Sequence, residues 1–218
     1  MCFSAEVSFG ASAILVTTGV LTIRESNKKE QLFFAMIPIL FGIQQFMEGW
    51  LWVSMQNEGY DIIRTVSMFG FLIFAQLVWP VWVPLSAYTL ETNKTRKRLI
   101  TFSLVLGIFL AFLLGYRFFA YDVSAFIQEK HIFYQVGHFK STNWWSGIFY
   151  LLPALFPFIF SGYKKVNILG YLMLLMFVIS KVFYIRYMIS TWCLFAGVLS
   201  VYILFIVKDM NRVREIDA

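Results

Sequence analysis

Three polar side chains interrupt a long apolar run from Gln31 to Met55: the amides of Gln44 and Gln45 and the carboxyl group of Glu48. In a helix, Gln44, Glu48 and Trp52 lie on one face, because they are spaced four residues apart. The run exceeds the roughly 20 apolar residues that cross a bilayer. An ionisable group at membrane depth costs about 2–3 kcal/mol or more, and therefore indicates a functional site.

Further polar and aromatic residues are predicted to lie near the same site. Gln76 stands one helical turn before Pro80, Lys181 is near the end of the sixth apolar segment, and Trp192 is near the start of the seventh. The predicted ligand-binding set is Gln44, Gln45, Glu48, Trp52, Gln76, Lys181 and Trp192. The alternative for Glu48 is a structural role, with Lys181 or Arg117 neutralising its charge.

Both cysteines and both histidines of the chain, Cys2, Cys193, His131 and His138, fall on the same predicted side of the membrane. A Cys2–Cys193 disulfide is one interpretation, since the outside of a cell is oxidising. All four residues could instead bind zinc, although no local CxxC or HxxxH spacing supports this. Removal of Met1 would also make Cys2 an N-terminal nucleophile. Finally, the cysteines can simply be small buried residues.

The composition indicates an integral membrane protein. Of the 218 residues, 60% are hydrophobic, 20% aromatic and only 14% charged, whereas soluble domains have about 25% charged residues. No linker-like stretch divides the chain, so residues 1–218 are predicted to form a single domain. Phosphate-binding glycine loops and zinc-finger spacings are absent from the sequence.

Seven apolar segments are predicted to be transmembrane helices, because only helices satisfy their own backbone in lipid when barrel-type alternation is missing. The fold class is therefore an all-α bundle of seven helices. The segments are Ser8–Ile23, Gln31–Met55, Thr65–Leu90, Leu99–Phe119, Trp144–Phe160, Val166–Phe183 and Ser190–Val207. The longest connection, Ala120 to Asn143, contains β-forming residues around Ala125–Ile127 and His131–Val136, which predict a short β-hairpin between helices four and five.

The distribution of basic residues predicts the orientation. Of the 18 Lys and Arg residues, twelve fall on one side, which makes that side cytoplasmic and places the N-terminus outside and the C-terminus inside. The twelve are Arg24, Lys28, Lys29, Lys94, Arg96, Lys97, Arg98, Lys164, Lys165, Lys208, Arg212 and Arg214. The net charge of +6 is thereby explained by topology and by contact with anionic lipid rather than by nucleic-acid binding.

Several families of seven-helix proteins are excluded by missing motifs. A retinal protein needs a lysine in the middle of the last helix, and Ser190–Val207 contains none. Motifs of the DRY and NPxxY type, typical of G-protein-coupled receptors, are also missing. The helix-borne HxxxH of the alkaline ceramidase and adiponectin-receptor superfamily is absent as well.

Four blocks of sequence carry a resemblance to a known group. They are MCFSAEVSF at the start, LFGIQQFMEGWLW, WPVWVPLS and STWCLFAGVLSVY. Together they resemble an uncharacterised family of small bacterial membrane proteins that begin Met-Cys-Phe-Ser-Ala. The matching residues are Cys2, Phe3, Ser4, Gln45, Glu48, Gly49, Trp82, Pro84, Trp192 and Cys193. The resemblance implies a shared outer site without naming its ligand, and covers the loop with His131 and His138 least well.

The sequence thus predicts a multi-pass protein of the cytoplasmic membrane that binds or senses a lipid or small amphiphile. An aromatic pocket with a few convergent polar groups is typical of such a site. One alternative is a metal- or thiol-dependent membrane enzyme acting at the same place, and another is a proton or ion transporter that uses Glu48 and Lys181. The expected partners are membrane lipids, and a homo-oligomer is left open.

Overall fold

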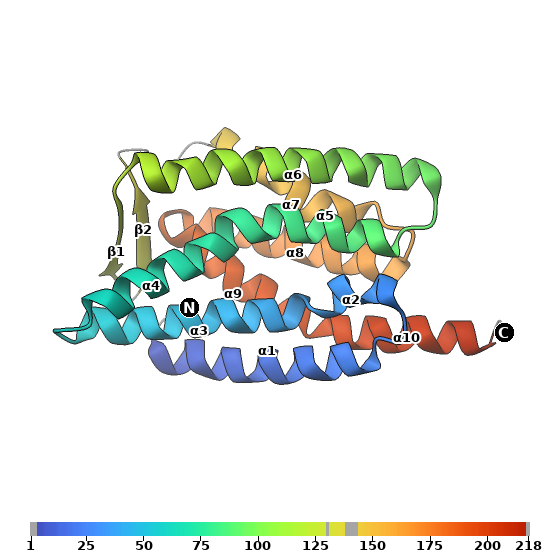
Figure 1. Ribbon diagram of the computed structural model, residues 1–218, viewed down its shortest axis with the longest axis horizontal. Helices are drawn as coiled ribbons and strands as arrows, with labels where there is room; N and C mark the ends of the chain where they lie inside the picture. Colours follow the sequence, from blue (N-terminus) through green and yellow to red (C-terminus); the bar gives the residue numbers. More distant parts are fainter. Residues whose placement is uncertain (1–3, 130, 138–143, 217–218) are drawn as a thin grey trace.

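The computed structural model describes residues 4–129, 131–137 and 144–216. It is a bundle of long helices with one two-stranded sheet at one end (Figure 1). In chain order the elements are α1 Ala5–Glu25, α2 Lys29–Ala35, α3 Ile37–Gln56, α4 Asp61–Ile73, the π-helix η1 Phe74–Val78, α5 Trp79–Leu90, α6 Lys94–Ala120, β1 Val123–Gln128, β2 His131–Val136, α7 Trp144–Ile159, α8 Lys164–Phe183, the 3-10 helix η2 Ile185–Tyr187, α9 Met188–Ser200 and α10 Tyr202–Ile216.

Within the described residues, six helical stretches are long and apolar enough to cross a membrane, which suggests a multi-pass membrane protein. They are Ala5–Glu25, Lys29–Gln56, Asp61–Leu90, Lys94–Ala120, Lys164–Phe183 and Ile185–Arg212. The seventh predicted crossing corresponds to α7, which has only 16 residues and contains Pro153 and Pro157. Because a full crossing needs about 20 residues, the seventh span and the in–out orientation stay predictions.

Two ends of the bundle differ in composition. At one end, called here the basic end, lie the α1–α2, α5–α6 and α7–α8 connections and the far part of α10 (Figure 1). The twelve basic residues counted above lie in these segments or in the helix ends that border them. The opposite end, called the hairpin end, carries the α3–α4 turn and the β-hairpin (Figure 1). The basic segments are therefore gathered at a single end of the molecule.

Close helix contacts depend on glycine. A Cβ added at Gly42 on α3 would stand 2.7 Å from the Val16 side chain of α1, and one at Gly19 would stand 2.5 Å from Ile39. At Gly107 on α6 the added atom would meet the carbonyl oxygen of Pro80 at 1.8 Å. Small residues let membrane helices approach closely and gain van der Waals contact. These positions hold α1 and α5 against their neighbours.

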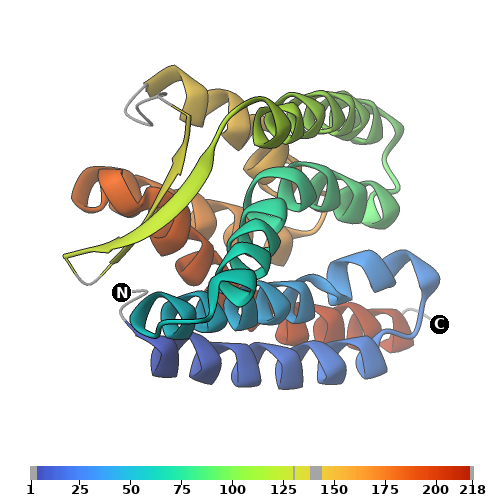
Figure 2. The ribbon, with the colours of Figure 1, turned by 60° about the vertical axis from the view of Figure 1, so that its left-hand side comes forward.

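The predicted hairpin is confirmed. Strands β1 and β2 pair antiparallel, with Val123 opposite Val136 and Gln128 opposite His131. Ile132, Tyr134 and Val136 of β2 alternate with half-buried residues and point into the bundle, as the two-residue period of a strand requires. Figure 2 shows the hairpin running across the end of the bundle, from α6 towards the start of α9.

Candidate functional site

The polar residues of α3 lie on its inner side. Gln44, Gln45 and Glu48 are all fully buried, and Trp52 is almost so. With 3.6 residues per turn, these four positions occupy an arc of about 100° around the helix. Gly42 and Gly49, at one edge of the arc, pack against α1, so the arc itself faces the interior. The predicted shared face of Gln44, Glu48 and Trp52 is thus buried in the bundle.

Glu48 is joined to α9. The Ser190 hydroxyl, in the first turn of α9, donates to Oε1 of Glu48 at 2.5 Å. Both side chains are buried, so this hydrogen bond links α3 to α9 inside the bundle. Ser190 was not among the predicted site residues, although it lies only three residues before Cys193.

Gln44 is oriented by an aromatic neighbour. Trp79, the first residue of α5, donates its indole N–H to Oε1 of Gln44 at 2.8 Å. The Trp79 ring also stacks on Phe41, with ring centroids 3.8 Å apart. On the α9 side, the Cys193 side chain interacts with Gln44 and lies within electrostatic reach of Glu48. Helices α3, α5 and α9 therefore contribute jointly to this region, which we call the Glu48 cluster: Gln44, Gln45, Glu48, Trp79, Ser190 and Cys193.

The cluster and its surroundings contain enclosed polar atoms without a hydrogen-bond partner. Neither amide atom of Gln45, Nε2 or Oε1, has a hydrogen-bond partner. The buried indole N–H groups of Trp52 and Trp192 also lack one. Burying such a group without a partner costs about 1–3 kcal/mol. More than 90% of buried polar groups in proteins are paired. Several exceptions around one carboxyl group indicate a place built to meet water or a ligand.

A narrow apolar cavity begins beside the cluster and extends towards the basic end. It measures about 20 Å³, enough for one water molecule. Trp79, Trp192 and Cys193 line it near the cluster, and Val83, Phe158 and Met173 line it further away. The walls beyond the cluster are almost entirely hydrocarbon. The site thus combines a polar end with an apolar extension.

The β-hairpin covers the cluster from the hairpin end. Ile132 and Tyr134 of β2 share a buried apolar group with Leu51, Trp52 and Cys193. The Tyr134 ring lies flat on Phe71 of α4, with centroids 4.9 Å apart and an interplanar angle of 3°. The hairpin therefore packs against the parts of α3 and α9 that carry the cluster.

A second set of contacts fixes the tip of the hairpin. His131 stacks on Tyr187 at 4.4 Å between centroids, and the Tyr187 hydroxyl donates to Oε2 of Glu129 at 3.2 Å. Tyr187 ends η2, directly before α9. Burial lowers the pKa of His131 from its ordinary value, while the nearby Glu129 carboxylate acts in the opposite direction. These contacts join the tip of the hairpin to the start of α9.

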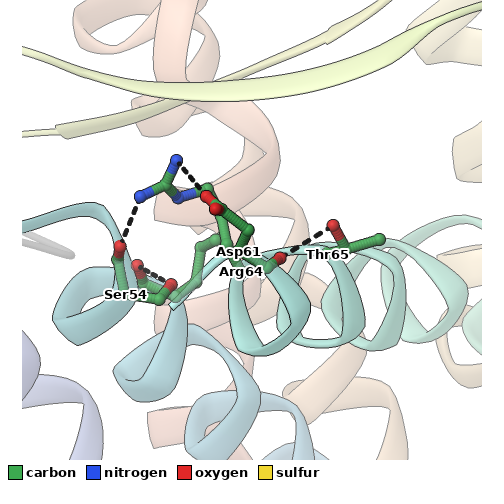
Figure 3. A network of polar contacts seen from close by, with 5 residues as sticks. Ser54, Asp61, Arg64 and Thr65 are labelled. Atoms are coloured by element: carbon green, nitrogen blue, oxygen red, sulfur yellow. Dashed lines mark hydrogen bonds and ion pairs between the residues drawn. The ribbon is translucent and has the colours of Figure 1, made fainter. Parts of the chain in front are cut away.

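The turn after α3 is tied by Arg64, as Figure 3 shows. Its guanidinium donates to the Ser54 carbonyl at 2.7 Å and pairs with Asp61 at 3.4 Å. A cation at a helix C-terminus satisfies orphan carbonyl groups and complements the helix dipole. Thr65 additionally donates to the Asp61 carbonyl at 3.0 Å. These contacts fix the end of α3 relative to the start of α4.

Two other predicted site residues, Gln76 and Lys181, lie outside the Glu48 cluster as defined above. Gln76 lies in η1 and is half-buried, with an enclosed Oε1 that has no hydrogen-bond partner. The Tyr150 hydroxyl donates to the neighbouring Ala75 carbonyl, and π-helical turns often occur at functional sites. Lys181 is buried near the end of α8. Pairing of Glu48 with Lys181 or Arg117 stays a prediction, since the contacts described here do not test it.

Cys2 and His138 lie outside the described residues. The predicted disulfide with Cys193 and the predicted four-residue zinc site therefore stay predictions. Cys193 itself is buried in α9, and His131 lies on β2. Among the residues that the structure describes, no group of three or more potential metal ligands is found.

Comparison with known proteins confirms the resemblance noted above. A model of a family of unknown function, DUF6629, matches residues 1–218. The chain belongs to this family. No curated protein and no solved structure matches it significantly. Family membership therefore covers the whole chain, including the Glu48 cluster, and leaves the activity to be inferred from the site.

Proposed function

We propose that this membrane protein binds a single-chain lipid or another small amphiphile, with the ligand's polar group at the Glu48 cluster and its chain in the adjoining cavity. The observation that carries the proposal is Gln45. Its side chain is fully buried, yet neither its donor nor its acceptor has a partner. A polar group inserted between α3 and its neighbours would satisfy both atoms and remove a cost of about 1–3 kcal/mol for each.

The chemistry of the site favours an amphiphile over a wholly polar ligand. Around the cluster, the indole N–H groups of Trp52 and Trp192 are hydrogen-bond donors that have no acceptor. The Glu48 carboxyl group is a hydrogen-bond acceptor. The cavity beyond them is lined by Val83, Phe158 and other apolar side chains. Ligand pockets typically combine an apolar lining with a few fixed polar groups.

The size of the cavity supports a sensing role. At about 20 Å³, it accommodates water in this conformation, and an alkyl chain would enter only if side chains such as Phe158 and Trp192 moved apart. Because these residues belong to α7 and α9, ligand binding would change helix packing. A ligand that prefers one packing over another shifts the population towards it.

Tryptophan quenching tests the proposal. A fatty acid and a lysophospholipid with bromine at the chain midpoint would be titrated into purified protein in mild detergent. We expect saturable quenching of tryptophan fluorescence, reversed by the unbrominated compound, because bromine quenches indoles that it contacts and Trp79 and Trp192 line the cavity.

Variants make this test specific. Gln45→Leu and Glu48→Gln should weaken binding at least tenfold, whereas Glu30→Gln on the exposed surface of α2 should bind normally. Quenching that never saturates, or that is identical in Gln45→Leu and the unaltered protein, would refute the proposal.

A second candidate function is proton or ion transport, and Glu48 favours it. The carboxyl group is fully buried in a segment that can cross the membrane, and such residues often mark ion pathways. Proteoliposomes loaded with a pH-sensitive dye distinguish the two. Transport predicts a proton flux that Glu48→Gln abolishes; the binding proposal predicts no flux in either protein.

A further inference from the structure

A second hollow, separate from the Glu48 cluster, opens at the hairpin end. It is a groove of about 620 Å³ between α4, the end of α6 and the base of the hairpin. The residues that line it are Phe69, Phe118, Phe119, Ala120, Tyr121, Asp122, Val123, Ser124, Gln135 and Gly137. None of them belongs to the Glu48 cluster, so the groove requires an explanation of its own.

The groove is a built feature, because its walls are fixed by specific contacts. Phe69 and Phe118 meet edge to face with centroids 6.0 Å apart. The backbone N–H of Gly137 donates to the Asp122 carbonyl at 2.9 Å and closes the hairpin base. Gly137 has a positive φ of 61°, and a Cβ there would stand 3.0 Å from the Tyr121 ring. A glycine therefore lets the Tyr121 ring pack against the backbone.

The chemistry of the groove is suited to a cation. Asp122 is the charged side chain among the described lining residues, and the aromatic residues Phe118, Phe119 and Tyr121 line the same groove. Aromatic faces attract ammonium groups, and a nearby carboxylate adds direct Coulomb attraction. Ser124 and Gln135 supply further polar groups. The groove therefore contains an acidic side chain in a protein whose net charge is +6.

The position of the groove indicates which kind of molecule carries the cation. Phe112, Tyr116 and Phe119 of α6 are 73%, 63% and 93% exposed, and their spacing places them in one stripe along the helix. Such a stripe is the surface that a membrane helix presents to lipid chains. It leads directly to Phe119, which also lines the groove, so a lipid packed on α6 would bring its headgroup to Asp122.

We propose that this groove binds the ammonium headgroup of a zwitterionic phospholipid, of the ethanolamine or choline type, while the acyl chains lie along the exposed stripe of α6. Aromatic side chains at the boundary of the hydrocarbon region commonly anchor membrane proteins in this way. The site is independent of the amphiphile proposed at Glu48 and holds a lipid of the surrounding bilayer.

Spin-labelled lipids test the proposal. The full-length protein is reconstituted into phosphatidylglycerol vesicles that contain a trace of phosphatidylethanolamine, phosphatidylcholine or phosphatidylglycerol, each spin-labelled at the same chain position. Electron paramagnetic resonance then measures the motionally restricted fraction. We expect a relative association constant at least threefold higher for the two ammonium lipids than for phosphatidylglycerol.

Asp122→Asn should remove this preference, and Asp122→Lys should reverse it in favour of phosphatidylglycerol. Asp61→Asn is the matched control, since Asp61 is also an exposed carboxylate at the hairpin end but is paired with Arg64. Thermal unfolding of each variant shows that the fold is retained.

Equal restricted fractions for the three lipids, or an unchanged preference in Asp122→Asn, would overturn the proposal.

Discussion

Two buried carboxyl groups, one at the basic end and one inside the bundle, are used in different ways. At the basic end, Glu91 is only 4% exposed and accepts three backbone N–H groups: those of Thr92 at 3.1 Å, Asn93 at 2.9 Å and Gly162 at 2.7 Å. Glu48 accepts the Ser190 hydroxyl and stands among amide and indole groups that lack partners. Glu91 therefore joins two loops, whereas Glu48 lies in an incompletely satisfied site.

Other polar side chains at the basic end follow the same rule. Asn167 donates to three carbonyl groups at the end of α7, those of Phe158, Ile159 and Ser161. Gln31 of α2 donates to Asn211 of α10, which in turn donates to the Glu25 carbonyl. Polar groups at the basic end therefore form hydrogen bonds between distant segments of the chain. Near Glu48, by contrast, buried polar atoms remain without a hydrogen-bond partner and could bind water or a ligand.

The largest expected effect is at Glu91. Glu91→Ala leaves three backbone N–H groups without their acceptor and should lower the free energy of unfolding by about 3–5 kcal/mol. Circular dichroism of the purified protein in detergent, followed during heating, measures the loss. Glu58→Ala, at an exposed position of the α3–α4 turn, is the control and should change little. A similar melting temperature for both variants would contradict the structural role of Glu91.

Asn167 gives the next largest effect. Asn167→Leu removes the donors of three hydrogen bonds and should destabilise the protein by about 2–3 kcal/mol. Asn57→Leu is its matched control, because Asn57 Nδ2 bonds a single carbonyl, that of Val53, at an exposed helix end. We expect less than about 1 kcal/mol for the control. The same heating experiment ranks the two, and equal losses would show that the basic end depends less on Asn167 than its contacts imply.

Replacing either of two buried glutamines by leucine should change the stability of the protein in opposite directions or by different amounts. Gln45→Leu removes amide atoms that have no partners and should leave stability unchanged or raise it by up to about 1 kcal/mol. Gln31→Leu breaks the bond to Asn211 and should lower stability by about 1 kcal/mol. Measured without added amphiphile, a large loss in Gln45→Leu would mean that Gln45 is a structural residue and would remove the main support for a ligand at this site.

The smallest effect is the pH dependence at the hairpin tip. Burial lowers the pKa of His131 in the folded protein, so this group contributes stability that is fully present above its ordinary pKa of about 6.5. That contribution decreases as the pH falls below this value, because protonation then favours the unfolded chain. His131→Phe keeps an aromatic ring on Tyr187 but cannot titrate. The melting temperature of the unaltered protein should therefore fall more between pH 7 and pH 5 than that of the variant.

The fold was largely predictable from local sequence patterns. Apolar runs bounded by charged residues located the helices, since a membrane span must be long, apolar and internally hydrogen-bonded. The β-forming residues between Ala120 and Asn143 located the hairpin. The fifth predicted segment, Trp144–Phe160, matches α7, whose 16 residues include Pro153 and Pro157.

The sequence by itself also identified Gln44, Gln45 and Glu48, because an amide or carboxyl group within an apolar run is unusual wherever its helix packs. Only the tertiary structure decided that Glu48 meets Ser190 of α9, 142 residues away, and that Tyr134 of the hairpin covers this region. The tertiary structure also distinguished the role of Glu91 from that of Glu48. Both are acidic residues next to or within apolar segments, and their roles differ because three backbone N–H groups converge on Glu91, an arrangement that depends on how distant loops meet.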